Sequence, residues 1–202
     1  MKTLLRSISL LMVLAIFSLN GRAQHAEPAP SANLDKLLKI ELGLHGVGLS
    51  CELPLNYRWV IDLSTGLGGG YYVSKTDVSR FNSSFIINDP VAYFKSEFKY
   101  YYSRSKRLSK RKQIRNNTGN YIAFQSKYTT RRVFNDNDWD RIYSPLNRTL
   151  LNEIHWGIQR PMGQKFLFNF HVGLGYASDF DFKSSWTYPA LGVKFAYILA
   201  KH

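Results

Sequence analysis

The stretch Phe166-Leu-Phe-Asn-Phe-His-Val-Gly-Leu-Gly-Tyr-Ala177 decides the fold of this chain. Every second residue, counted from the first, is large and apolar, whereas the residues between them include Asn169, His171 and two glycines. Successive side chains of an extended strand point to opposite faces. The alternation therefore predicts a β-strand with one large apolar face and one small polar face, because a helix would leave part of the apolar set on its other side.

The same alternation recurs after residue 36 and predicts eight strands. Its parity switches between Leu44 and Val47, which a tight turn at His45-Gly46 explains. A single bulged strand over residues 36–55 is the alternative. No helical pattern is expected beyond the first 23 residues. The predicted strands are residues 36–44, 47–55, 57–73, 91–103, 121–134, 149–159, 166–177 and 188–200.

The first 23 residues have the pattern of a secretory signal peptide. A basic start precedes the apolar run Leu10–Phe17, and small residues precede the expected cleavage site before Gln24. The run is far shorter than the roughly 20 residues that a membrane-spanning helix needs. The expected organisation is a signal peptide at residues 1–23, a linker at 24–35 and an outer-membrane β-barrel at 36–202.

Charge limits the class of partner. Without Lys2, Arg6 and Arg22 of the signal, the 27 Lys and Arg become 24, against 14 Asp and Glu, so the net charge is +10. A basic chain often binds nucleic acid, but export makes nucleic acid the wrong partner and favours anionic lipid headgroups or cell-wall polymers. A single cysteine, Cys51, cannot form an internal disulfide.

The connections between the predicted strands alternate in length. Outer-membrane barrels have short periplasmic turns and longer outer loops, so we expect the short connections and both chain ends on the periplasmic side. The tight turn after Leu44 and the long basic link of residues 104–120 fit this scheme less well. The short connections are Pro54–Asn56 and Arg160–Lys165, and the long polar ones are residues 74–90, 135–148 and 178–187.

Alternation alone does not say which face is inside, because a soluble ligand-binding barrel alternates with its apolar face inward. Three features favour an apolar exterior. The polar face is rich in glycine, as suits a narrow lumen; the apolar face continues through all eight strands; and aromatic residues lie towards strand ends, as in the interfacial girdles of membrane barrels. The expected girdle residues are Trp59, Tyr71, Tyr100, Tyr102, Tyr188 and Tyr197.

In these features the chain resembles the small eight-stranded outer-membrane barrel proteins of Gram-negative bacteria, the OmpA-type transmembrane domain and its relatives. The resemblance implies an all-β, closed, eight-stranded, antiparallel up-and-down transmembrane barrel, porin-like in architecture, with an N-terminal signal peptide. It is carried by Gly21-Arg-Ala-Gln24, Gly66-Leu-Gly-Gly-Gly-Tyr-Tyr72, the basic turn leading into Gly119-Asn-Tyr-Ile122, and Gly173-Leu-Gly-Tyr176.

The polar face of the predicted strands carries charges of both signs. An eight-stranded barrel has an interior just wide enough for side chains, and buried charges need partners. We therefore expect these residues to pair and plug the lumen, with a water- or ion-conducting path as the alternative. The predicted lumen charge network is Lys39, Glu41, Arg58, Asp62, Lys95, Glu97, Lys99, Lys127, Glu153, His155, His171 and Lys194.

Glu153, His155 and His171 come close together if the strands before and after Met162-Gly163 form a hairpin. Such a group is typical of a proton relay, a metal pair or the acid/base set of an outer-membrane lipid hydrolase. No serine is spaced to join it as a nucleophile, so the expectation is lumen polar residues, with no catalytic, cofactor-binding or metal-binding residue and no cofactor.

Seven basic residues lie in one link and are expected at a periplasmic turn, where they attract anionic headgroups or cell-wall polymer. The predicted function is that of a non-enzymatic integral outer-membrane barrel with a structural or surface-interaction role, and its partners are outer-membrane lipids rather than nucleic acid. A lipid-modifying enzyme (acyl hydrolase or transferase) and a soluble periplasmic ligand-binding barrel are the alternatives. The basic turn comprises Arg104, Lys106, Arg107, Lys110, Arg111, Lys112 and Arg115.

Overall fold

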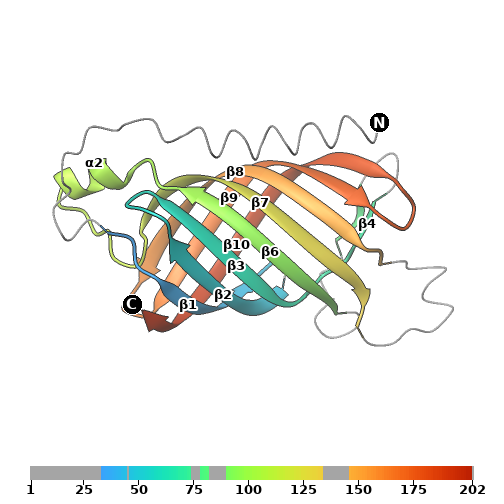
Figure 1. Cartoon of the computed structure of the whole chain (residues 1–202), viewed down its shortest axis with the longest axis horizontal. Coiled ribbons are helices and arrows are strands. Elements are labelled where there is room, and N and C mark those ends of the chain that lie inside the picture. Colours follow the sequence, from blue (N-terminus) through green and yellow to red (C-terminus); the bar gives the residue numbers. More distant parts are fainter. Residues whose placement is uncertain (1–32, 45, 74–77, 82–89, 134–145, 202) are drawn as a thin grey trace. The chain divides into compact units, whose positions relative to one another are not determined.

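The computed structural model describes residues 33–44, 46–73, 78–81, 90–133 and 146–201, so the expected signal peptide and most of the linker lie outside it. Eight strands form a closed antiparallel barrel in the order β1-β10-β9-β8-β7-β6-β3-β2, which confirms the predicted fold (Figure 1). The barrel strands are β1 (Leu37–Gly43), β2 (Gly46–Pro54), β3 (Trp59–Gly68), β6 (Val91–Tyr100), β7 (Gly119–Arg132), β8 (Thr149–Met162), β9 (Phe166–Asp179) and β10 (Ser185–Lys201).

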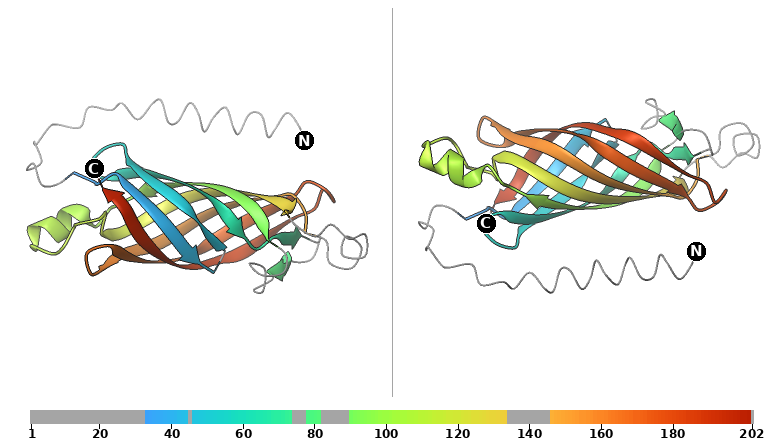
Figure 2. Two further views of the ribbon diagram at one scale, coloured as in Figure 1. Left: turned by 90° about the horizontal axis from the view of Figure 1, so that it is seen from below. Right: turned by 90° about the horizontal axis from the view of Figure 1, so that it is seen from above.

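Strands that are neighbours in this order are hydrogen-bonded to each other, and the pairing of β1 with β10 closes the ring. Ile40 lies opposite Tyr197 across this seam, and Figure 2 shows the tilted strands on opposite sides of the barrel. Leu42 lies opposite Val47 in the β1–β2 pair. Residues 36–55 therefore form two strands joined by a turn, and the single bulged strand is excluded.

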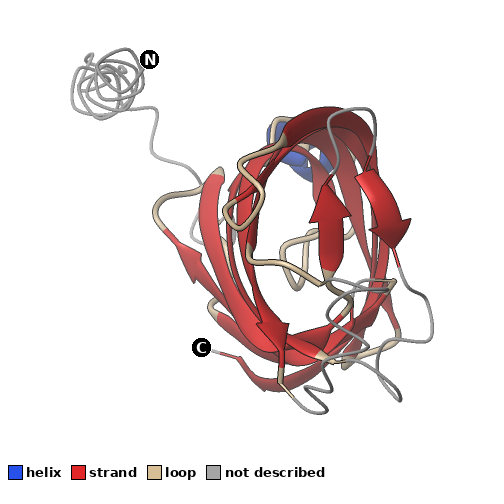
Figure 3. Ribbon diagram, turned by 90° about the vertical axis from the view of Figure 1, so that its right-hand side faces the viewer, coloured by secondary structure: helices blue, strands red, loops and turns tan. Residues whose placement is uncertain are grey.

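Strand β9 contains the stretch that predicted the fold. Leu167, Asn169 and His171 are buried inside the barrel, whereas Val172 and Leu174 are exposed on its outer face. Figure 3 looks along the barrel from the end that carries β4 (Tyr71–Val73) and shows the strands as a ring. The apolar face of the stretch points outward because the alternating pleat leaves only the small and polar face for the narrow interior.

The predicted third strand, residues 57–73, is wrong in its second half. β3 ends at Gly68, and β4 pairs with β5 (Val78–Phe81) in a separate two-stranded sheet. The break falls at consecutive glycines, whose backbone is freer than that of other residues. A Cβ at Gly70 would crowd the side chains of Val91 and Leu146, so this position needs glycine for the close approach.

The expectation of no helix is also wrong, because Arg104–Ser109 forms the short helix α2. It lies at one end of the barrel with the β2–β3 and β8–β9 turns, and β4 lies at the other end (Figure 1). Arg107 donates two side-chain hydrogen bonds to the carbonyl of Gln113 and so ties the helix to the chain that follows it. Among the described residues, no helix has the length and hydropathy to cross a membrane.

Candidate functional site inside the barrel

The centre of the lumen holds two ammonium groups and two carboxylates from β1, β2, β3 and β6. The Nζ of Lys39 lies 2.8 Å from Oε1 of Glu52 and 3.3 Å from Oδ2 of Asp62. The Nζ of Lys99 lies 3.1 Å and 2.7 Å from the same two oxygens. All four side chains are sealed from solvent. Each charge has two partners of opposite sign, which offsets the high cost of removing charges from water.

A second set of ion pairs surrounds this centre. The carboxylate of Glu41 lies 3.1 Å from the Nζ of Lys39, 3.4 Å from that of Lys95 and 3.8 Å from that of Lys194. The Nζ of Lys194 also lies 3.3 Å from Oε2 of Glu97. These pairs link β1, β6 and β10, so the network crosses the interior instead of following one hairpin.

The charges of the lumen network balance each other. Five lysines and five carboxylates make up this network, so with neutral histidines it has no net charge. Asp179, buried at the end of β9, is a further carboxylate outside the network. The strong positive charge of the chain therefore belongs to other surfaces. The ten residues are Lys39, Lys95, Lys99, Lys127 and Lys194 with Glu41, Glu52, Asp62, Glu97 and Glu153.

Glu153 and His155 of β8 and His171 of β9 form a compact buried group. Oε2 of Glu153 lies 3.8 Å from Nδ1 of His155 and 3.8 Å from Nε2 of His171. The two imidazole rings stack with centroids 4.2 Å apart. The ligand atoms of all three residues lie within 4.8 Å of one another, so they could hold a metal ion. The close approach that the sequence suggested for these residues is present.

Glycines on the lumen face make room for rings. A Cβ at Gly192 would overlap the imidazole of His171, and one at Gly175 would overlap the ring of Tyr188. A Cβ at Gly157 would overlap the ring of Tyr121 in the same way. The glycine-rich face thus allows aromatic and imidazole rings to cross an interior that is too narrow for two side chains at the same level.

The turn before β7 closes the lumen at the α2 end. Asn116 and Asn117 both have φ near +55°, the left-handed conformation that asparagine tolerates better than most residues. Asn117 donates its amide to the Oε2 of Glu52 at 2.7 Å and to the backbone carbonyl of Asp35 at 2.8 Å. The carboxylate of Asp35 accepts the backbone N–H of Asn116. These bonds hold the turn against the central ion network.

Strand β4 packs against the opposite end of the lumen. Tyr71 and Val73 are buried in an apolar cluster with Leu151 of β8 and Ala177 of β9. The Nζ of Lys127 lies 5.2 Å from the ring centroid of Tyr71 and forms a cation–π contact with it. Between this plug and the central network lies a cavity of about 30 Å³. At that size it accommodates one or two water molecules.

Outside the barrel strands, a charged clamp ties the β9–β10 turn to its neighbours. Asp181 accepts hydrogen bonds from the guanidinium groups of Arg131 and Arg148, at 2.6 Å and 2.8 Å for their Nη2 atoms. The hydrogen bond from Arg131, followed by those from Arg148, holds the pKa of Asp181 well below its usual range. The turn is therefore anchored by a carboxylate that stays ionised at neutral pH.

Eleven of the twelve predicted network residues lie on the lumen side of the barrel strands, and Arg58 does not. Arg58 precedes β3 and lies in the turn, where the pleat no longer fixes the direction of its side chain. Its guanidinium donates to the hydroxyl groups of Tyr100 and Ser105 at 3.0 Å and 2.9 Å. The prediction that Arg58 belongs to the lumen network is wrong.

Two expected girdle residues also turn inward. Tyr71 is buried in the plug, and the hydroxyl of Tyr188 donates to Oε1 of Glu153 at 2.6 Å. Tyr71 left the outer face because the strand broke at the glycines before it. Tyr188 has the same parity as Gly192 and Lys194 on β10, so the alternation already indicated the lumen for it.

The basic turn divides into anchored and exposed residues. Arg104 has only 4% of its surface exposed. Its guanidinium donates to the backbone carbonyl of Asn33, before β1, and to that of Ile114, before β7. Arg115 donates to the carbonyl of Gly163. Arg107 is tied to Gln113 as described above. Arg115 is exposed although it makes its bond to Gly163, and the other exposed members are Lys106, Lys110, Arg111 and Lys112.

Sequence reasoning missed several residues that hold the network together. Glu52 is fully buried and pairs with both central lysines, and the parity of β2 places it on the inner face, so it could have been found. Gln159 donates to the Oε2 of Glu52 and accepts from Asn169. Asn117 is the third missed partner. It lies outside a strand, and no sequence pattern marks it.

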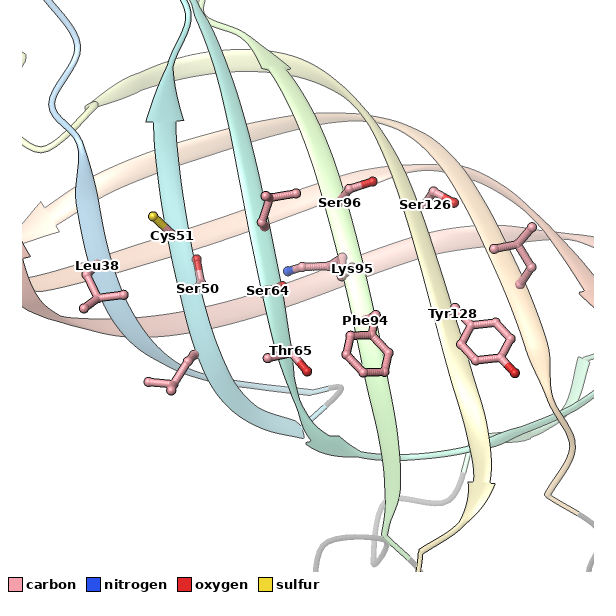
Figure 4. A pocket seen from close by; sticks show the side chains of 13 residues that line it. Leu38, Ser50, Cys51, Ser64, Thr65, Phe94, Lys95, Ser96, Ser126 and Tyr128 are labelled. Atoms are coloured by element: carbon pink, nitrogen blue, oxygen red, sulfur yellow. The ribbon is translucent and has the colours of Figure 1, made fainter. Parts of the chain in front are cut away.

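The outer face has a groove of about 560 Å³ over β2, β3, β6 and β7 (Figure 4). It arises where the small side chains of Cys51, Ser96 and Ser126 lie among large apolar ones such as Phe94 and Tyr128. No histidine, aspartate or glutamate is among the described residues that line it. Its outward-facing serines, Ser96 and Ser126, therefore lack, in the described part of the chain, an adjacent histidine or carboxylate that could activate a hydroxyl nucleophile. The buried Ser50 donates its hydroxyl to Oδ1 of Asp62.

Comparisons with known proteins give little beyond this geometry. No protein-family model matches the chain, and no curated protein matches it either. Among solved structures it is similar to the outer membrane protein AlkL, whose structure was determined by solid-state NMR in DMPC lipid bilayers. The two sequences are 8% identical, and the match covers 90% of this chain and 95% of that chain with a TM-score of 0.34. A TM-score this low carries no weight, so the architecture rests on the strand pairing described above.

Proposed function

We propose that this chain is an integral outer-membrane β-barrel with a structural or surface-interaction role. Its lumen is plugged by charged side chains, and its contacts with other molecules are made by the outer loops and the outer surface. Only helices and closed barrels satisfy their backbone hydrogen bonds within a bilayer. Closed antiparallel barrels with an even number of strands are the form found in bacterial outer membranes.

The observation that carries the proposal is the apolar outer face. Leu174 is 75% exposed, Ile154 63% and Phe94 57%, and exposed apolar side chains occur on all eight barrel strands. Soluble monomeric proteins rarely expose contiguous apolar patches beyond a few hundred Å². Apolar surface left in water costs about 25 cal/mol per Å². Lipid removes that cost around the whole circumference.

The height of this face fits a bilayer. On β9 the outward apolar side chains run from Phe166 to Tyr176, ten residue steps, or about 34 Å along the strand. At a strand tilt of about 40° that length is about 26 Å along the barrel axis. Outer-membrane barrels have an apolar band about 25 Å tall. The apolar part of β9 therefore has nearly the same height as such a band.

The plugged lumen is supported by the distribution of charge and space. The lumen charges pair with one another, the turn with Asn117 closes one end and β4 packs at the other. The cavity between them, about 30 Å³, holds water molecules but is too small to act as a pore for hydrated ions. We infer a barrel that is closed in its resting state.

The same observations weigh against the two alternatives. A soluble ligand-binding barrel needs an apolar interior, whereas this small cavity is lined by Glu41, Lys95, Lys127 and other polar groups. A lipid-modifying enzyme needs its nucleophile and base on the lipid-facing surface. Here His155 and His171 face the lumen, and the outward-facing serines of the groove, Ser96 and Ser126, have no histidine or carboxylate among the described residues that line it.

Export through a signal peptide at residues 1–23 and a periplasmic location of the basic turn belong to the same proposal. Lys106, Lys110, Arg111 and Lys112 are exposed beside the barrel end, where each adds about 1 kcal/mol of attraction to an anionic membrane surface. Replacing these four with Gln is expected to lower the amount of anionic phospholipid that copurifies with the barrel. Unchanged lipid content would exclude headgroups as the partner of this turn.

Cell fractionation with a heat-modifiability gel tests the main proposal. The protein is expected in the outer-membrane fraction, and its electrophoretic mobility is expected to change on boiling, as it does for folded membrane barrels. Recovery in the soluble periplasmic extract would refute the membrane location. Release of acyl chains from lipopolysaccharide or phospholipid by the purified barrel, abolished by His155→Ala, would instead establish the enzyme.

A further inference from the structure

The buried group on β8 and β9 contains two acceptors that face each other. Nε2 of His155 lies 3.1 Å from Oε1 of Glu97. A carboxylate at neutral pH only accepts, so Nε2 carries a proton, and in the neutral imidazole Nδ1 then carries the lone pair. That Nδ1 is buried, has no hydrogen-bond donor among the described residues, and points at Oε2 of Glu153 from 3.8 Å. Two buried acceptors at this distance repel unless a positive charge lies between them.

The surrounding residues orient the group as they orient metal ligands. Glu97 holds His155 in one tautomer, in the carboxylate–histidine arrangement common beside metal ions. Gln125 donates to Oε2 of Glu153 at 2.9 Å, and Tyr188 donates to Oε1 at 2.6 Å. The carboxylate and the imidazole are therefore both fixed before any ion binds. Such outer partners set the basicity and direction of the ligands.

No lysine of the described residues lies within ion-pair distance of this carboxylate. In the described part of the chain, Glu153 has no ion pair with an ammonium group, unlike the other four lumen carboxylates. Lys194 is committed to Glu97 and Glu41, and Lys127 lies over aromatic rings. Glu153 is therefore the network carboxylate to which a bound cation would add the most direct charge contact.

The separations suit a small transition-metal ion after a slight movement. Bonds of about 2.1 Å to nitrogen and oxygen at tetrahedral angles place ligand atoms about 3.4 Å apart. The two separations from Oε2 of Glu153 to the imidazole nitrogens of His155 and His171 are both 3.8 Å. Binding by both imidazoles also requires the two rings to leave their stacked arrangement, so that both nitrogen lone pairs point at the same ion. The cavity of about 30 Å³ is lined by Glu153 and His171, so a water molecule can occupy the fourth position.

We propose that Glu153, His155 and His171 form a binding site for one divalent transition-metal ion, with zinc the best match to two imidazoles and one carboxylate. Imidazole with carboxylate and an open fourth position is a typical zinc ligand set. Gly192 belongs to the site, because it leaves the space that the imidazole of His171 occupies. The site does not depend on the membrane location of the barrel.

Zinc and cobalt binding to the folded, purified, untagged protein test the proposal. The three histidines outside the lumen strands, His25, His45 and His202, are replaced by Ala in every sample to remove background. After chelator treatment and reloading, elemental analysis is expected to find one zinc per folded chain. Cobalt is expected to give the visible absorption of a nitrogen-ligated, low-symmetry site. The melting temperature is expected to be higher with zinc than with chelator.

Matched variants assign the binding. His171→Ala is expected to weaken zinc binding at least tenfold, and His171→Cys, which keeps a ligand, is expected to restore it. Glu97→Gln is expected to weaken binding about 10- to 100-fold, because it removes the partner that fixes the His155 tautomer. Ser64→Ala is the control, since its buried hydroxyl has no hydrogen-bond partner among the described residues, and it is expected to bind as the parent does.

Two results would overturn the proposal. One is a folded parent protein that retains no zinc and has the same melting temperature with zinc as with chelator, which means that water occupies the space between the acceptors. The other is stoichiometric zinc in the double variant His155→Ala with His171→Ala. The heat-modifiability gel is run on every variant, so loss of metal is compared only between folded proteins. A failure of metal binding leaves the membrane location of the barrel unaffected.

Discussion

Replacing Lys99 with Met tests whether the lumen network stabilises the barrel. Lys99 is fully buried, with its Nζ 2.7 Å from Asp62 and 3.1 Å from Glu52. At an effective dielectric constant of 20, these two contacts are worth about 6 and 5 kcal/mol before other terms. Repulsion from Lys39 and the desolvation of an ammonium, several kcal/mol, oppose this attraction. We expect Lys99→Met to lower the free energy of unfolding by about 3–5 kcal/mol.

The physical reason is charge imbalance and not lost volume. Lys99→Met leaves the ten-residue network with four lysines against five carboxylates. Asp62→Asn alone creates the opposite imbalance. The double variant restores neutrality and leaves Lys39 between Glu52 and Glu41, so we expect it to lose less than the sum of the single variants by at least about 2 kcal/mol.

The free energy of unfolding is measured by urea titration in lipid vesicles, followed by tryptophan fluorescence and checked by the heat-modifiability gel. Lys106→Met on exposed α2 is the control and is expected to change it by less than about 0.5 kcal/mol. A loss below about 1 kcal/mol for Lys99→Met would show that the network contributes no net stability. Additive single and double variants would show that Lys99 and Asp62 do not act as a pair.

Three further substitutions test other parts of the structure. Val172→Arg, near the middle of the apolar band, is expected to lower the free energy of unfolding in vesicles by about 2–4 kcal/mol, and Tyr176→Arg, at the edge of the band, by about 0–1 kcal/mol. Equal losses for the two variants would argue against a bilayer around this face. Gly192→Ala is expected to lower the free energy of unfolding by about 1–3 kcal/mol, because the new Cβ overlaps the ring of His171. In the double variant with His171→Ala this loss is expected to be relieved, and effects of the two substitutions that simply add would contradict the overlap. Because its arginine partners lower the folded-state pKa of Asp181, its stabilisation is complete above the ordinary value of about 3.9 and is lost as the pH falls through the lowered pKa. The melting-temperature difference between wild type and Asp181→Asn should therefore be constant from pH 7 to about pH 5 and shrink below about pH 3, and a constant difference there would exclude this clamp.

Most of the lumen could be predicted because a strand fixes the direction of each side chain. Lys39 and Glu41 on β1, and Lys95, Glu97 and Lys99 on β6, alternate with apolar residues that face outward. Once the apolar face is assigned to the exterior, their burial follows from the pleat alone. Tyr188 shows that parity is the better guide, because its residue type suggested the girdle while its position on β10 pointed inward.

Prediction failed where strands end and where partners lie far apart in the chain. Arg58 and Tyr71 lie just beyond the ends of β3, so turn geometry and the break after Gly68 decide their directions. The partner of Glu52 at Gln159 is 107 residues away, and their meeting depends on the stagger between strands around the closed barrel. No local pattern contains that stagger.

The distribution of the lumen charges favours closure of the barrel over an open sheet. The β3–β6 pair carries two lysines and two carboxylates, and the β7–β8 pair carries Lys127 and Glu153, so each of these pairs is neutral on its inner face. The β1–β2 pair carries Lys39 against two carboxylates, a net −1, and the β9–β10 pair carries Lys194 on β10 and Asp179 at the end of β9.

The closing β1–β10 seam brings opposite charges together, because Gly43 lies opposite Lys194 and the Nζ of Lys194 reaches 3.8 Å from the carboxylate of Glu41. In an open sheet β1 and β10 would be edge strands with unpaired backbone groups, and Glu41 and Lys194 would lie at opposite edges. Backbone pairing and charge compensation are therefore completed by the same step, the closure of the ring.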